Sequence, residues 1–122
     1  MGGINRSILT GRLVADPEVR YTSKEVAVTH FRIAINRFGS EVADFINCVA
    51  WGGLAKVCGE YLKKGRMVAV EGRLQARSYK AKNGQNKSIT EVIIENMQML
   101  DSKFYNAAAQ ATPQQAAETI AV

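Results

Sequence analysis

The segment between Gly72 and Thr90 combines basic side chains and an aromatic ring with no acidic residue. Its five basic residues are Arg73, Arg77, Lys80, Lys82 and Lys87. Alternate side chains of a β-strand point to opposite faces, so a strand here would place Arg73, Arg77 and Tyr79 on one face. Guanidinium groups beside an aromatic ring suit a polyanion that also exposes flat rings. Single-stranded nucleic acid fits that description best.

Four aromatic residues fall on the strand faces opposite the core pattern, or at strand ends, and each has basic or amide neighbours on that face. They are Phe38, Phe45, Trp51 and Tyr79. Stacking of a base on an aromatic side chain stabilises binding by about 1–3 kcal/mol and tolerates any base. The alternative is core packing, above all for Trp51, which could plug the mouth of a barrel. We assign Phe31 and Tyr61 to the core.

Hydrophobic alternation and turn signals predict five strands that could position these side chains. The predicted strands are Arg6–Val14, Val26–Arg37, Phe45–Trp51, Met67–Tyr79 and Ser88–Leu100. An amphipathic helix is predicted over Leu54–Leu62, between the third and fourth strands. Lys82-Asn83-Gly84-Gln85 supplies a hairpin turn before the fifth strand. This order is typical of the OB-fold, a five-stranded Greek-key barrel that binds oligonucleotides or oligosaccharides.

The charge distribution divides the chain into a basic domain and a different C-terminal segment. Residues 1–105 hold sixteen basic and ten acidic residues, a net charge of +6, because Glu118 is the only charged residue after them. A positive domain of this size favours nucleic acid as a partner, with an inert basic surface as the alternative. Residues 106–122 are rich in Ala and Gln and predict a disordered tail.

The sequence offers little support for an enzyme, a cofactor or a metal site. His30 lies in mid-strand without a Ser or Cys partner at motif spacing, which favours a structural role. Glu91 and Glu95 share a face of the fifth strand, as acids on a solvated or interface edge commonly do. Cys48 and Cys58 have no metal-ligand spacing and are expected to be buried. No apolar run approaches the ~20 residues that span a bilayer, and we expect a cytoplasmic, nucleoid-associated protein.

Several motifs resemble those of the bacterial single-stranded DNA-binding proteins, in order over residues 4–101 and without large gaps. The matching segments are Ile8–Leu13, Asp16–Thr22, Asp44–Gly52, Tyr61–Gly65, Val70–Leu74, Thr90–Val92 and Met97–Leu100. The resemblance implies an OB-fold that assembles as a homotetramer, a dimer of dimers. It also implies sequence-independent wrapping of single-stranded DNA during replication, recombination and repair.

The resemblance further implies site residues. The stacking positions of the family fall on Phe38, Phe45, Trp51 and Tyr79. Its basic positions fall on Arg73 and Arg77, with weaker matches at Arg6, Lys63 and Lys80; Lys82 and Lys87 extend this basic set on the hairpin. The family commonly ends in an acidic tip that recruits partner enzymes. This chain ends at Thr119-Ile120-Ala121-Val122, as expected of a truncated chain or a tailless paralogue, and gives no basis for recruitment by that route.

Two other functions fit the same residues. An OB-fold of this kind could serve as an interaction module in a primosome-like protein complex, with DNA affinity secondary. It could also bind single-stranded RNA, in which the 2′-hydroxyl is the group that distinguishes the two nucleic acids.

Overall fold

The computed structural model describes residues 2–100 and contains six strands and one helix. The elements are β1 (Ser7–Leu13), β2 (Glu18–Tyr21), β3 (Ala27–Asn36), β4 (Ala43–Trp51), α1 (Gly52–Tyr61), β5 (Met67–Lys80) and β6 (Asn86–Met99). The five predicted strands and the helix between the third and fourth of them are confirmed. The short strand β2 was not predicted. Its four residues alternate polar and apolar (Glu-Val-Arg-Tyr), but the segment is short and all four residues are exposed, so it has no buried face.

Five of the strands close into a barrel, which confirms the OB-fold. The hydrogen-bonded order is β1-β5-β6-β4-β3-β2, and a further pairing of β1 with β3 closes the ring. That closing pair is short and joins Arg12 to Ala34 and Leu13 to Ile33. β4 and β6 run parallel, whereas the other pairings are antiparallel. β2 lies outside the ring, against the outer edge of β3.

The barrel interior is filled by the apolar side chains that alternate inward from its strands. Ile33, Val68, Val70 and Val92 are among the largest fully buried side chains, and Phe31 is buried as predicted. The predicted burial of both cysteines is also confirmed. Burial raises the pKa of Cys48 to about 12 and that of Cys58 to about 11, so both thiols stay protonated at neutral pH.

The helix α1 packs against the barrel through a narrower face than the sequence predicts. Ala55 and Cys58 are its buried residues, and Gly59 lets β2 approach, because a Cβ there would lie 2.4 Å from a methyl group of Val19. Tyr61 is about half exposed, so its assignment to the core is wrong. Tyr61 belongs to the apolar face predicted for the helix, but within α1 only Ala55 and Cys58 are buried, and the next residue, Leu62, is the one that enters the core.

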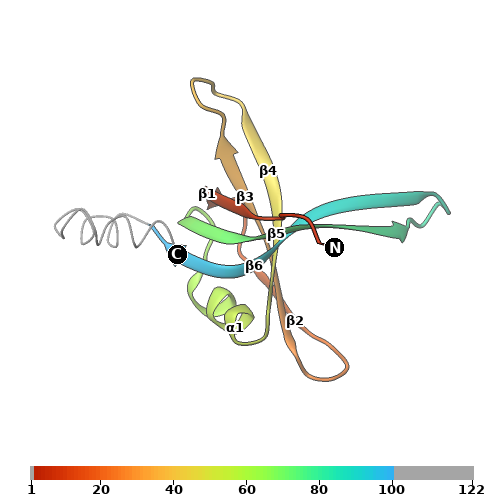
Figure 1. The fold of residues 1–122 in the computed structure, drawn as a ribbon. Helices are drawn as coiled ribbons and strands as arrows, with labels where there is room; N and C mark the ends of the chain where they lie inside the picture. Colours follow the sequence, from red (N-terminus) through yellow and green to blue (C-terminus); the bar gives the residue numbers. More distant parts are fainter. Residues whose placement is uncertain (1, 101–122) are drawn as a thin grey trace.

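Two long hairpins extend beyond the barrel as arms (Figure 1). The β3–β4 arm ends at the turn around Phe38, and the β5–β6 arm ends at the turn around Gly84. From Arg73 to Lys80 every residue of β5 is exposed, so this half of the strand packs against no core. The side chain of Asn5 forms two hydrogen bonds with the backbone of Leu74 at the base of this arm. Its Nδ2 donates to the Leu74 carbonyl at 2.7 Å, and its Oδ1 accepts from the Leu74 N–H at 2.9 Å.

A β-bulge marks the point where β5 leaves the barrel. The register between β5 and β6 shifts between Glu71 and Gly72. A Cβ at Gly72 would lie only 1.9 Å from the carbonyl oxygen of Ile93 on the facing strand. Glycine is therefore the residue that fits where the two backbones approach so closely.

Two sequence predictions fall outside the described residues: the domain boundary at residue 105 and the disordered tail over residues 106–122. Within residues 2–100, no helix has the length and apolar character needed to cross a membrane.

Gly72→Ala should destabilise the protein, because the added methyl group must push apart two paired strands at the bulge. We expect a loss of at least about 1–3 kcal/mol in the free energy of unfolding, the usual cost of overpacking, measured by urea denaturation. Gly53→Ala is the matched control, since nothing lies within 4 Å of a Cβ at Gly53. Equal stability of the two variants would contradict the role assigned to the bulge.

Candidate nucleic-acid interface

The four predicted aromatic residues all lie on the surface. Phe38 is fully exposed at the tip of the β3–β4 arm, and Phe45, Trp51 and Tyr79 are 52%, 50% and 45% exposed. Phe45 and Trp51 lie on one face of β4, about 20 Å apart at about 3.3 Å per residue. Trp51 is outside the buried core cluster, so it does not plug the barrel. The parity argument therefore placed all four side chains correctly.

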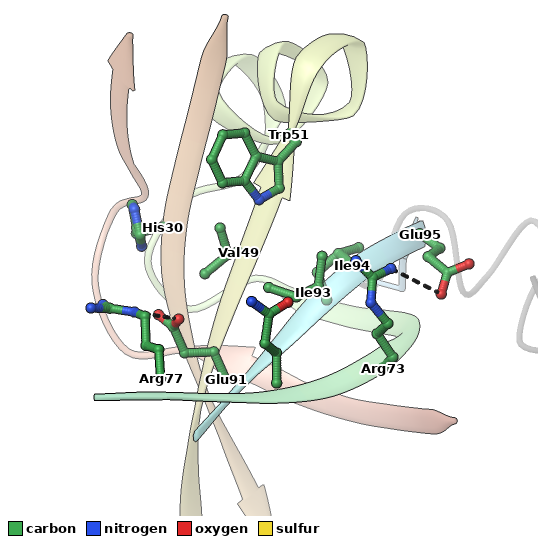
Figure 2. Close-up of a pocket in the computed structure, with 10 residues that line it drawn as sticks. His30, Val49, Trp51, Arg73, Arg77, Glu91, Ile93, Ile94 and Glu95 are labelled. Atoms are coloured by element: carbon green, nitrogen blue, oxygen red, sulfur yellow. Dashed lines mark hydrogen bonds and ion pairs between the residues drawn. The ribbon is translucent and has the colours of Figure 1, made fainter. Parts of the chain in front are cut away.

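Trp51 borders a groove between the β3–β4 face and the base of the β5–β6 arm. The groove has a volume of about 720 Å³ and is lined by residues of both hairpins. Figure 2 shows Trp51 and His30 along one side and two ion pairs, Arg73–Glu95 and Arg77–Glu91, along the other. An aromatic ring thus lies across the groove from two guanidinium groups.

A second hollow of about 300 Å³ continues this surface towards β2. It shares three lining residues with the groove: His30, Arg77 and Glu91. Sequence reasoning did not place His30 or Glu91 at the site. His30 and Arg32 are two residues apart on β3 and so point to the same face, and this spacing could have indicated that His30 faces outward.

The basic face is not free of carboxylates, which corrects the expectation from the sequence of β5. Arg77 Nε lies 2.9 Å from Glu91 Oε1, and Arg73 Nη1 lies 3.9 Å from Glu95 Oε1. Glu91 is buried rather than at a solvated edge, and its hydrogen bond raises the pKa of the Arg77 guanidinium. Both acids come from β6, so an inspection of β5 alone could not reveal them.

Arg6 is likewise paired with an acid, the buried carboxylate of Glu71 on β5. The remaining predicted bases are differently placed. Lys80, Lys82 and Lys87 are exposed at the outer end of the β5–β6 arm, and none forms an ion pair within residues 2–100. Lys63 is exposed in the connection between α1 and β5 and lines neither hollow.

Two of the four aromatic rings are accompanied by a guanidinium group. The Arg32 guanidinium carbon lies 4.9 Å from the centre of the Phe45 ring, and that of Arg77 lies 5.8 Å from the centre of the Tyr79 ring. Such cation–π contacts are within the usual range for attraction. Each arm therefore presents a ring with an adjacent positive charge.

The β3–β4 arm is held by an ion pair below its tip. Arg37 donates to both carboxylate oxygens of Asp44, over 2.9–3.2 Å. This hydrogen bonding lowers the pKa of Asp44 and raises that of Arg37. The backbone N–H of Arg37 also donates to the carbonyl of Val42 at 2.9 Å, which closes the turn that carries Phe38.

The chemistry of the interface is that of binding. Its components are exposed rings, guanidinium and ammonium groups, and amide side chains such as Gln75 in the groove. In the part of the chain that the structure describes, no cluster of three or more His, Cys, Asp or Glu residues could hold a metal ion.

Comparison with known proteins gives a consistent result. Residues 4–100 match the single-strand binding protein family. The chain is 45% identical over 105 residues to a single-stranded DNA-binding protein of Oceanobacillus iheyensis, covering 82% of this chain and 65% of that protein. It is 46% identical over 105 residues to single-stranded DNA-binding protein A of Bacillus subtilis, covering 82% and 61% respectively.

A protein of Listeria innocua named single-stranded DNA-binding protein 3 is 40% identical over 121 residues, which cover 95% of this chain and 76% of that protein. The chain thus spans less than two thirds of the length of the Oceanobacillus and Bacillus proteins. Its similarity extends over the whole of the described barrel and both arms.

Phe38→Ala should leave stability within about 0.5 kcal/mol of the wild-type value, since the ring is fully exposed. Phe31→Ala, the buried counterpart on the same hairpin, should cost about 3–5 kcal/mol. Chemical denaturation of both variants measures the difference. A large loss for Phe38→Ala would mean that its ring packs against the protein, and would remove it from the interface.

Proposed function

The chain belongs to the single-strand binding protein family, and from this premise we propose that it binds single-stranded DNA without sequence preference. The role is one of binding rather than catalysis: the protein covers and protects exposed strands in replication, recombination and repair. We infer that it acts in the cytoplasm, in association with the nucleoid.

The observation that carries the proposal is the set of four exposed aromatic residues distributed over two arms and the groove between them. In our proposal, bases stack on Phe38, Phe45, Trp51 and Tyr79. Every base has a π-face, so this mode of contact gives affinity without reading sequence. The half-exposed rings of Phe45, Trp51 and Tyr79 support the proposal, because each leaves about half of its surface accessible to a base.

Phosphates would be bound by the basic residues around these rings. Lys80, Lys82 and Lys87 lie at the outer end of the β5–β6 arm, and Arg73 lies at its base beside the groove. Arg6 and Lys63 are further candidates at the edge of the path. Binding through such contacts releases counterions, so affinity should fall steeply as salt rises.

We also propose that four chains assemble as a dimer of dimers. Within residues 2–100, β1 is paired with β5 along Ser7–Arg12 but meets β3 only at Arg12 and Leu13. The other edge of its first half is therefore open, and Ile8 there is 60% exposed. An open edge with an exposed apolar residue favours pairing with another copy. Light scattering should give four times the mass of one chain.

Replacing Trp51 with Ala should weaken binding to oligo-dT by about 5- to 150-fold, the equivalent of one base–aromatic stack. Anisotropy of a fluorescently labelled oligonucleotide measures the affinity without relying on tryptophan emission. Tyr61→Ala is the control, because Tyr61 is an equally exposed aromatic residue that lines neither hollow. Equal affinities of Trp51→Ala and wild type would rule out stacking at Trp51.

The same assay separates the other two functions. Equal affinity for oligo-U and oligo-dT would favour an RNA-binding protein. An affinity that is weak and nearly independent of salt would favour a protein-interaction module, since nucleic-acid wrapping requires counterion release.

A further inference from the structure

We propose that Glu91 is a positioning residue of the interface: it holds the Arg77 guanidinium group beside the Tyr79 ring. In this arrangement Arg77 supports base stacking and does not serve as a phosphate ligand. The inference rests on the proposed function. It assigns different roles to Arg73 and Arg77, which the sequence of β5 presents as equivalent.

The Arg77 guanidinium group is held at two places. Its Nε donates a hydrogen bond to Glu91 Oε1 at 2.9 Å, and its central carbon lies 5.8 Å from the centre of the Tyr79 ring. Arg77 and Tyr79 are two residues apart on β5 and so share a face. The acid, the guanidinium group and the ring therefore form one chain of contacts from the groove towards the arm.

Burial of Glu91 keeps Arg77 in place. Glu91 is only 5% exposed, and a carboxylate so shielded from water requires a hydrogen-bonded cation. In the described part of the chain, Arg77 is the residue that forms an ion pair with it. If Arg77 turned to a DNA phosphate, the Glu91 carboxylate would lose this cation and would also face a second anion.

Arg73 differs in each of these respects. Its ion pair with Glu95 is at 3.9 Å, and the two side chains are 50% and 43% exposed. Water already competes for such a pair, which contributes little to stability. A phosphate can replace Glu95, and the released carboxylate is then solvated.

These differences predict that the two arginines contribute to different components of the DNA affinity. One component is electrostatic and depends on salt, and the other remains at high salt. Each phosphate that a free cation neutralises on a single strand adds about 0.7 to the slope of log K against log salt concentration. Arg73 supplies such a cation, whereas the charge of Arg77 is already compensated by Glu91. The contribution of Arg77 should therefore appear in the affinity that remains at 1 M salt, where electrostatic binding is minimal.

The test is a titration of the 122-residue chain with oligo-dT over a range of salt concentrations. Arg73→Gln should reduce the slope by about 0.7 and leave the affinity at 1 M salt unchanged. Arg77→Gln/Glu91→Gln, which removes the two opposite charges together, should leave the slope nearly unchanged and lower the affinity at 1 M salt about two- to fivefold, the range of an exposed cation–π contact. That loss should vanish in a Tyr79→Ala background.

Glu91→Gln provides the complementary variant. It should lower the affinity at 1 M salt as the double variant does, while the slope becomes steeper by about 0.7 because the Arg77 charge is no longer compensated. Arg77→Gln leaves Glu91 without a cation and could unfold the site. The slope is therefore compared in the double variant Arg77→Gln/Glu91→Gln, which removes this carboxylate together with the guanidinium group; thermal melts verify that each variant is folded.

Equal slope reductions in Arg73→Gln and in Arg77→Gln/Glu91→Gln, with wild-type affinity at 1 M salt, would overturn the inference and make both arginines phosphate ligands. A loss at 1 M salt that persists in the Tyr79→Ala background would also overturn it. These outcomes leave the proposed function intact, since they require that the wild-type protein binds. No binding of oligo-dT by the wild type would overturn the proposed function and this inference with it.

Discussion

The structure depends on a close approach of two backbones at the bulge between Glu71 and Gly72. Before the bulge, β5 contributes Val68 and Val70 to the core; from Arg73 onwards, every residue of the strand is exposed. A Cβ at Gly72 would collide with the carbonyl of Ile93. Because Gly72 has no side chain, β5 and β6 stay paired where they leave the barrel. The first half of β5 can then be buried in the core while its second half carries a binding surface.

The second requirement is electrostatic. The positive charges of the β5–β6 arm repel one another, and acids compensate its two arginines: Arg73 is paired with Glu95 and Arg77 with Glu91. Outside the arm, Arg6 is paired with Glu71 of β5. The acids lie on the barrel side of the arm, whereas the lysines at its far end form no ion pair within residues 2–100. The positive charge of the arm is therefore compensated by acids at its base and uncompensated at its tip. The tip can attract the phosphates of a nucleic acid from a distance.

Strand periodicity and turn chemistry predicted most of the fold and the outward faces of the aromatic residues. Phe38, Phe45, Trp51 and Tyr79 were placed correctly because alternation depends only on the sequence within one strand. The errors concern relations between strands. The partners of Arg73 and Arg77 lie on β6, and the short strand β2 is positioned by its pairing with β3 and by the close approach of Val19 to Gly59. Tyr61 was misassigned because helical periodicity predicts a broader apolar face than the one that α1 buries, which consists of Ala55 and Cys58.

The central claim is that a single strand of DNA runs over both arms and the groove between them. Photo-crosslinking to oligo-dT that contains 5-iododeoxyuridine, followed by peptide mapping, tests it most directly. We predict cross-links in residues 38–51 and in residues 73–87, and among the aromatic residues at Phe38, Phe45, Trp51 or Tyr79. Cross-links confined to α1 and β2, with none on either arm, would contradict the account.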